Sequence, residues 1–144
     1  MKAAFYKGKR RLFNRLVSWW DRGPYSHMEI VFDDQTAASS SFMDGGVRIK
    51  PIQFDDSRWD FIELPRELFA EDISRDWFYN HLGLRYDFLG LIRFAIDAIP
   101  ERKSKYFCSE ACLASLGIDE AWRFTPNAAY TFLHNLIELK AQNV

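Results

Sequence analysis

Four short runs of strand-forming residues between residues 28 and 64 constrain the fold of this chain more than any other feature. Clusters of Asp and Gly separate the first three runs, and this spacing is typical of an antiparallel meander. We therefore expect a small antiparallel sheet within residues 23–64. The predicted strands are Met28–Phe32, Thr36–Phe42, Val47–Ile52 and Trp59–Leu64.

After Pro65 the apolar residues follow helical spacing instead. Pro and Gly residues mark where these helical segments end, and Thr125-Pro126 has the N-cap and first-turn pattern of a helix start. Strands followed by helices indicate an α+β domain in which the sheet packs against helices. The predicted helical segments are Leu68–Leu82, Tyr86–Ile99, Cys108–Leu116 and a last helix from Thr125 towards His134.

The N-terminal segment is strongly basic. Residues 1–22 carry seven Lys and Arg residues against Asp21 alone, a net charge of +6. Phe13, Leu16, Val17 and Trp20 follow helical spacing, so we predict a basic amphipathic N-terminal helix within residues 1–22. Its charge fits either a solvated face or contact with an anionic surface. No nucleic-acid motif accompanies it, so nucleic acid is not an expected partner.

Length and composition indicate one domain, residues 1–144. The chain is 48% hydrophobic and 17% aromatic over 144 residues, enough for one core. No stretch approaches the ~20 apolar residues of a membrane span, so no transmembrane segment is expected. The N-terminus lacks the apolar run and cleavage site of a secretory signal, and a cytoplasmic location is therefore the expectation.

The chain has two cysteines, and Cys108 lies at the predicted start of a helix. Free N–H groups and a partial positive charge at this position favour a thiolate. His27 is a candidate base: strand alternation places it with Glu29, on the face opposite Met28, Ile30 and Phe32. Structural interpretations are also open, with His27 as a polar residue opening a strand and both thiols as small buried groups, which suits Cys112 well.

Two further motifs point to a family. Tyr-Ser-His-Met-Glu-Ile-Val-Phe, followed by Gly-Gly-Val-Arg-Ile, resembles the strands that carry the base in NlpC-type cysteine peptidases. Leu-Gly-Leu-Arg-Tyr-Asp-Phe-Leu-Gly and Tyr-Phe-Cys-Ser-Glu-Ala-Cys resemble their nucleophile block. The block here follows the His strands, an order similar to the circularly permuted branch, the YiiX-like proteins and their lecithin–retinol acyltransferase relatives. The resemblance implies a circularly permuted papain-like fold.

The same resemblance implies site residues. It makes Cys108 the nucleophile, His27 its base, and Tyr86 a neighbour of the nucleophile that helps to bind the oxyanion or the substrate carbonyl. The residue that orients the imidazole would fall at Ser39. Glu29, on the strand face of His27, is an equal candidate for that role.

The implied function is a cysteine-dependent hydrolase or acyltransferase without a cofactor. Its substrate would be a peptide, a peptidoglycan stem peptide, or a lipid ester or amide. A cell-wall substrate would require release by lysis or delivery by a viral particle, as for a phage- or prophage-encoded protein. Two alternatives are a non-catalytic binding module with a degraded triad, and a metal site formed by Cys108, Cys112 and His27.

Overall fold

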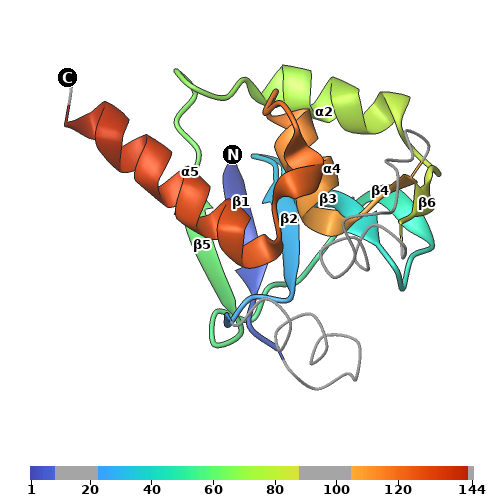
Figure 1. Cartoon of the computed structure of the whole chain (residues 1–144). Helices are drawn as coiled ribbons and strands as arrows, with labels where there is room; N and C mark the ends of the chain where they lie inside the picture. The colour runs from blue at the N-terminus through green and yellow to red at the C-terminus, as the bar shows by residue number, and fades with distance from the viewer. Residues whose placement is uncertain (9–22, 88–104, 143–144) are drawn as a thin grey trace.

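The computed structural model describes residues 1–8, 23–87 and 105–142. Within them one seven-stranded sheet has the order β5-β1-β2-β3-β4-β6-β7 and is antiparallel except for the β6–β7 pair (Figure 1). The predicted α+β class, with a sheet packed against helices, is confirmed. The strands are β1 (Lys2–Tyr6), β2 (His27–Val31), β3 (Thr36–Ser41), β4 (Gly46–Pro51), β5 (Trp59–Glu63), β6 (Arg85–Tyr86) and β7 (Lys105–Tyr106).

The prediction of a helix at the N-terminus is wrong for residues 2–6, which form β1 between β5 and β2. Ala3, Ala4 and Phe5 are fully buried, because a central strand is paired on both sides. Ala3, Ala4 and Phe5 give only a weak alternation of apolar and polar residues, so the sequence of β1 carries little strand signal. The basic, helically spaced residues that follow favour a helix instead. Residues 9–22, on which the rest of that prediction falls, lie outside the described residues.

The predicted meander is confirmed for β2, β3 and β4, which pair in chain order. It is wrong for β5, which pairs with β1 at the other side of the sheet rather than with β4. The β3–β4 turn contains Gly45 with φ of 81°, a conformation that favours glycine. Short turns therefore guided the sequence interpretation correctly where strands are consecutive in the sheet.

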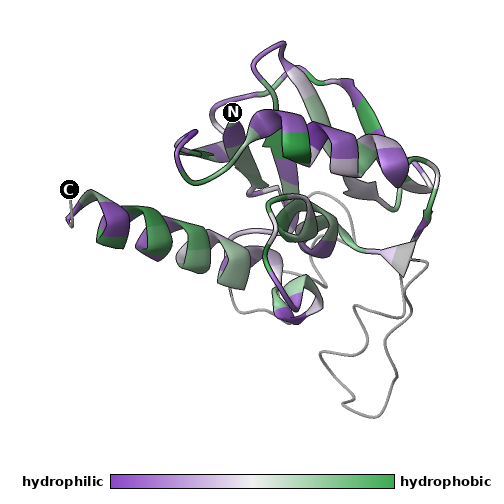
Figure 2. Ribbon diagram, turned by 90° about the horizontal axis from the view of Figure 1, so that it is seen from above, coloured by the Kyte–Doolittle hydropathy of each residue, from purple (hydrophilic) through white to green (hydrophobic). Residues whose placement is uncertain are grey.

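Helices cover the core face of the sheet. They are α2 (Glu71–Asn80), α4 (Cys108–Ser115) and α5 (Pro126–Ala141), with a short 3-10 helix η1 (Ala121–Arg123). Helix α4 packs on β2 and β3 and also contacts α2, α5 and η1. Seen from above, α2 and α4 lie over the sheet while α5 extends away from it (Figure 2).

The strand faces are as predicted, because Met28, Ile30 and Phe32 are all buried in the core. Helix α4 covers the predicted range, whereas α2 begins at Glu71, later than predicted. The prediction of a helix from Tyr86 is wrong at its first residue, which belongs to β6. Residues 88–104, which hold the rest of that segment, lie outside the described residues.

None of the helices in the described part of the chain is long and apolar enough to cross a membrane. This agrees with the expectation from the sequence for those residues.

A central β1 predicts that Phe5→Ala destabilises the fold by about 3–5 kcal/mol. Phe5 is fully buried and its ring contacts Tyr25 and Tyr130 at centroid distances of 5.4 and 5.2 Å. Phe61→Ala, on the neighbouring strand β5 but 37% exposed, is the matched control and should cost at most about 1 kcal/mol. Urea unfolding measures both changes, and equal costs for the two variants would contradict the central position of β1.

Candidate functional site

Cys108 is the first residue of α4, and polar contacts on both sides fix this helix start. The Glu110 carboxylate accepts a hydrogen bond from the Phe107 N–H at 3.3 Å, which caps the helix. Ser109 Oγ donates to the Phe124 carbonyl at 2.6 Å. The first N–H groups of a helix have no partner within it, so they and the helix dipole favour negative charge at this position.

The strand before α4 is also tied to the sheet, because Ser40 Oγ of β3 donates to the Tyr106 carbonyl of β7 at 2.5 Å. Ser40 is fully buried at this contact. This contact fixes the start of α4 relative to the sheet. It places Cys108 near His27, the first residue of β2.

His27 is the first residue of β2 and lies between a sulfur and a carboxylate. Its Nε2 is 2.7 Å from Oε1 of Glu29, and the ring also hydrogen-bonds the side chain of Cys108. Because Nε2 is engaged by Glu29, Nδ1 is the nitrogen left for the sulfur. The ring of Trp59 lies edge-on to the imidazole with centroids 6.4 Å apart. The structure thus brings the side chains of Cys108 and Glu29 to the same imidazole ring.

Electrostatics favour a protonated His27. Burial by itself lowers the pKa of the imidazole, but the charge and hydrogen bond of Cys108, followed by those of Glu29, outweigh it and raise the pKa to about 10. The side chain of His27 is 21% exposed, so one part of the ring reaches solvent. A cysteine and a histidine arranged in this way can exchange a proton and form a thiolate–imidazolium pair.

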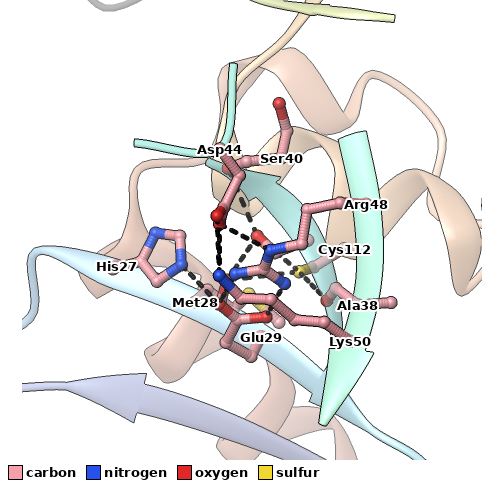
Figure 3. Close-up of polar contacts among 10 residues, drawn as sticks. His27, Met28, Glu29, Ala38, Ser40, Asp44, Arg48, Lys50 and Cys112 are labelled. Carbon is pink, nitrogen blue, oxygen red and sulfur yellow. Dashed lines mark hydrogen bonds and ion pairs between the residues drawn. The ribbon is translucent and has the colours of Figure 1, made fainter. Parts of the chain in front are cut away.

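Glu29 is held by a second partner on its other side. Its carboxylate accepts two hydrogen bonds from the Arg48 guanidinium of β4, one of them from Nη1 at 2.6 Å (Figure 3). Burial raises the pKa of Glu29, but Arg48 and His27 more than compensate and lower it overall. Glu29 is only 1% exposed, so it remains a buried carboxylate between two cationic groups.

Ser39 lies in the same part of the sheet but makes a different contact. Its Oγ donates to the Met28 carbonyl at 2.7 Å. His27 Nε2 contacts Glu29 instead. Of the two residues predicted to orient the imidazole, Glu29 is therefore the one in position to do so.

Cys112 fills a gap between β2 and β3. The backbone pairing of these strands comprises Ile30–Ala38 and Val31–Ala37. Beyond it the Cys112 thiol donates to the Met28 carbonyl at 3.5 Å. Burial raises the pKa of this thiol well above its ordinary value, so it stays protonated. Cys112 thus has a packing role, as its position in the sequence suggested.

Tyr86, on β6, lies near Cys108. Burial raises the pKa of its hydroxyl well above the ordinary value, and the charges of Cys108, Asp87 and Glu110 raise it further. The phenol therefore stays protonated and can donate a hydrogen bond at physiological pH. This agrees with the role that the resemblance implies, although that role itself stays a prediction.

A cleft of about 550 Å³ opens beside His27. Tyr86 and His27 line it together with the aromatic side chains of Trp59 and Phe42, and with Met43. Phe42 and Met43 are 52% and 67% exposed, so one part of the rim is apolar, beside the charged Asp44, Arg48 and Lys50. A substrate with an apolar portion could therefore lie next to the imidazole.

The metal hypothesis has no geometric support in the part of the chain that is described. No group of three or more His, Cys, Asp and Glu side chains there is arranged to hold a metal ion. The Cys112 thiol faces the carbonyls of Met28 and Ala38, and His27 Nε2 faces Glu29.

Comparison with models of protein families and with curated proteins finds no match to this chain.

Arg48 and Asp44 are the members of this site that the sequence interpretation missed. Asp44 accepts a hydrogen bond from Nε of Arg48 at 2.9 Å, so the guanidinium is held from both sides. The available signal was strand alternation, which places Arg48 on the face of β4 opposite the core residues Val47 and Ile49. That signal could not specify a partner two strands away.

The sulfur of Cys108 is expected to control the proton on His27. In Cys108→Ser the pKa of His27 should fall from about 10 by more than about one unit, because the charge and hydrogen bond of the sulfur are lost. NMR titration of the imidazole measures this change. Cys112→Ser is the matched control and should leave the titration unchanged, since the hydroxyl keeps the bond to the Met28 carbonyl. Equal shifts in both variants would contradict the assignment.

The same pKa predicts a pH dependence of stability. The folded-state pKa of His27 is about 10, above its ordinary value of 6.5, so protonation of the ring stabilises the fold. This contribution is complete below pH 6.5 and is lost as the pH rises through 10. Over that interval the free energy of unfolding of His27→Asn should fall by about 1–2 kcal/mol less than that of the unmodified chain. The exposed His134→Asn serves as control and should follow the unmodified chain.

Proposed function

We propose that this protein is a cysteine-dependent hydrolase or acyltransferase. The observation that carries the proposal is the line of side chains formed by Cys108, His27 and Glu29, with the sulfur at the N-terminus of α4. A nucleophile, a base and an orienting group in this order are the parts of a catalytic triad, which geometry rather than chain order defines.

Before substrate binds, the proton of the Cys108 thiol already lies on the His27 ring, which the sulfur and Glu29 keep protonated. The resulting thiolate attacks the carbonyl carbon of the substrate, and the carbonyl π electrons move to oxygen. The N–H groups at the start of α4 and the Tyr86 hydroxyl are the donors available to this oxyanion. Tyr86 is suited to the task because the raised pKa of its hydroxyl keeps the proton in place.

The second step is the collapse of the tetrahedral intermediate. The bond from carbon to the leaving nitrogen or oxygen breaks, and His27 gives its proton to that atom. An acyl-enzyme on Cys108 remains. His27 then removes a proton from water, in a hydrolase, or from an acceptor, in an acyltransferase. The deprotonated atom of that molecule bonds to the acyl carbon, and the bond from this carbon to sulfur breaks with release of the thiolate.

The fold proposed for this chain is a circularly permuted papain-like fold. Its support is the order of elements: β2 with His27 precedes α4 with Cys108, and the meander β2–β3–β4 lies beside that helix. By resemblance the substrate is an amide, as in a peptidoglycan stem peptide, or a lipid ester or amide. The apolar rim of the cleft at Phe42 and Met43 suits substrates with an apolar portion.

A non-catalytic binding module is the competing function, and one observation favours it. Cys108 is only 2% exposed, which is low for a residue that must meet a substrate. A module of this kind would use the cleft beside His27 for binding and would leave the thiol unreactive.

Alkylation of Cys108 by iodoacetamide separates the two functions. In a Cys112→Ser background, mass spectrometry should show Cys108 reacting well below the pH at which a free thiol of pKa ~8.5 reacts. His27→Ala should slow this reaction by about tenfold or more at neutral pH, because the proton acceptor is lost. Reaction at the pH of a free cysteine in both proteins would sink the catalytic proposal.

A further inference from the structure

We propose that Arg48 is a positioning residue, which clamps the Glu29 carboxylate across β3 and thereby holds the His27 ring towards Cys108. This inference rests on the proposed function and adds a fourth member to its line of side chains. Nothing in the resemblance assigns a role to this arginine.

The geometry requires an unusually long reach. Glu29 is on β2 and Arg48 on β4, and β3 runs between them, so their backbones are about 10 Å apart. Ser39 of β3 is directly paired with Arg48, and paired residues project from the same face of a sheet. The salt bridge therefore passes over Ser39.

Ser39 makes this crossing feasible because it is small and turned aside. Its hydroxyl is directed to the Met28 carbonyl, in the gap where the pairing of β2 and β3 ends. A larger polar side chain at this position would occupy the space through which Arg48 reaches Glu29. The residue that the resemblance suggested as an orienter thus serves the site by leaving it open.

The clamp fixes both ends of the carboxylate. Oε2 of Glu29 accepts from Nη1 of Arg48, and Oε1 accepts from Nη2 as well as facing Nε2 of His27. Such two-pronged contacts fix orientation as well as charge. The carboxylate has no freedom to rotate away from the imidazole while both prongs are in place.

Arg48 is itself held on its far side. Asp44 accepts from its Nε at 2.9 Å and also from Lys50 Nζ at 2.6 Å. The side chain of Arg48 is 14% exposed, so solvent does little to screen these contacts. The chain of contacts runs Lys50, Asp44, Arg48, Glu29, His27, and Figure 3 shows it between β2 and β4.

Charge balance gives the clamp a chemical purpose. A buried carboxylate next to His27 with no other cation would bind the imidazolium proton too firmly for its release to a leaving group. Arg48 offsets this pull while it keeps Glu29 ionised. Among the described residues, the titratable and charged groups around the imidazole and its partners are Tyr6 from β1, Glu29, Arg48, Asp44 and Lys50 from the sheet and its turn, Cys108 and Glu110 from α4, and Tyr86 and Asp87 at β6.

The experiment compares Arg48→Gln, Arg48→Lys and the control Arg75→Gln in a Cys112→Ser background. Arg75 also forms ion pairs, with Asp34 and Glu71, but at the β2–β3 turn, which is at the opposite end of β2 from His27. The rate of Cys108 alkylation by iodoacetamide is measured against pH, and NMR follows the titration of His27 in the same proteins. Thermal unfolding reports whether each variant is folded.

Removal of a fixed positive charge raises the pKa of every neighbouring group. In Arg48→Gln the midpoint of alkylation and the titration of His27 should therefore both move up by about one pH unit. Arg48→Lys keeps the charge but loses the two-pronged contact, so its midpoint should stay near that of the parent while its maximal rate falls several-fold. Arg75→Gln should change neither.

A purely structural salt bridge would give a different pattern. Arg48→Gln would then lower the melting temperature while the alkylation midpoint and the His27 titration stayed with those of Arg75→Gln, and the proposal would be overturned. If Arg48→Gln fails to fold, Arg48→Lys still tests the proposal. A lower maximal alkylation rate with an unchanged midpoint supports a positioning role, and an unchanged rate contradicts it. In a Glu29→Gln background Arg48→Lys should no longer lower the maximal rate, because the carboxylate that Arg48 positions is gone.

Failure of the proposed function gives a separate result. Cys108 in the parent protein would then alkylate like a free thiol, with no effect of His27→Ala. The NMR titration of His27 still decides the role of Arg48 in that case. A His27 titration that moves in Arg48→Gln would show that the clamp acts on the imidazole, and one that does not move would refute it.

Discussion

The site depends on one buried carboxylate. Glu29 lies on a strand face away from the core and is almost completely buried, so its charge has to be balanced by neighbouring groups rather than by water. His27 supplies one partner and Arg48 the other, from strands on either side of β3. The register of β2, β3 and β4 therefore determines the orientation of the His27 ring.

The two cysteines illustrate how position on one helix separates two roles. Cys108 and Cys112 are one turn apart on α4, yet the first meets His27 and the second meets backbone carbonyls of β2 and β3. The opening between these strands explains the difference, since it leaves the Met28 carbonyl in need of a donor. Ser39 and Cys112 both satisfy that carbonyl, and α4 is seated in the sheet by the same contacts.

Much of the local structure was predictable because its causes are local. Turn residues placed the β2–β3–β4 meander, strand alternation separated Met28 from Glu29, and the pattern before Cys108 located the start of α4. The position of Cys108 and the shared face of His27 and Glu29 followed from the same short-range rules. These rules do not extend to pairing between distant segments.

The unpredicted features all require knowledge of long-range register. β1 pairs with β5 through residues that are far apart in the chain, and no local pattern reveals such a partner. The choice between Ser39 and Glu29 required the direction of a hydroxyl at the point where two strands separate. The part that Arg48 takes in the site depends on β3, which places the small Ser39 between Arg48 and Glu29.

The place of β1 between β2 and β5 also governs the order in which this protein is able to fold. Lys2 pairs with Val31 on one side and with Glu63 on the other, so one edge of β1 stays unpaired until β5 has been synthesised. Non-local pairing of this kind slows folding, because chain entropy is lost before the contacts form. During translation β1 would thus keep one open edge, in need of protection from association with other chains until its second neighbour arrives.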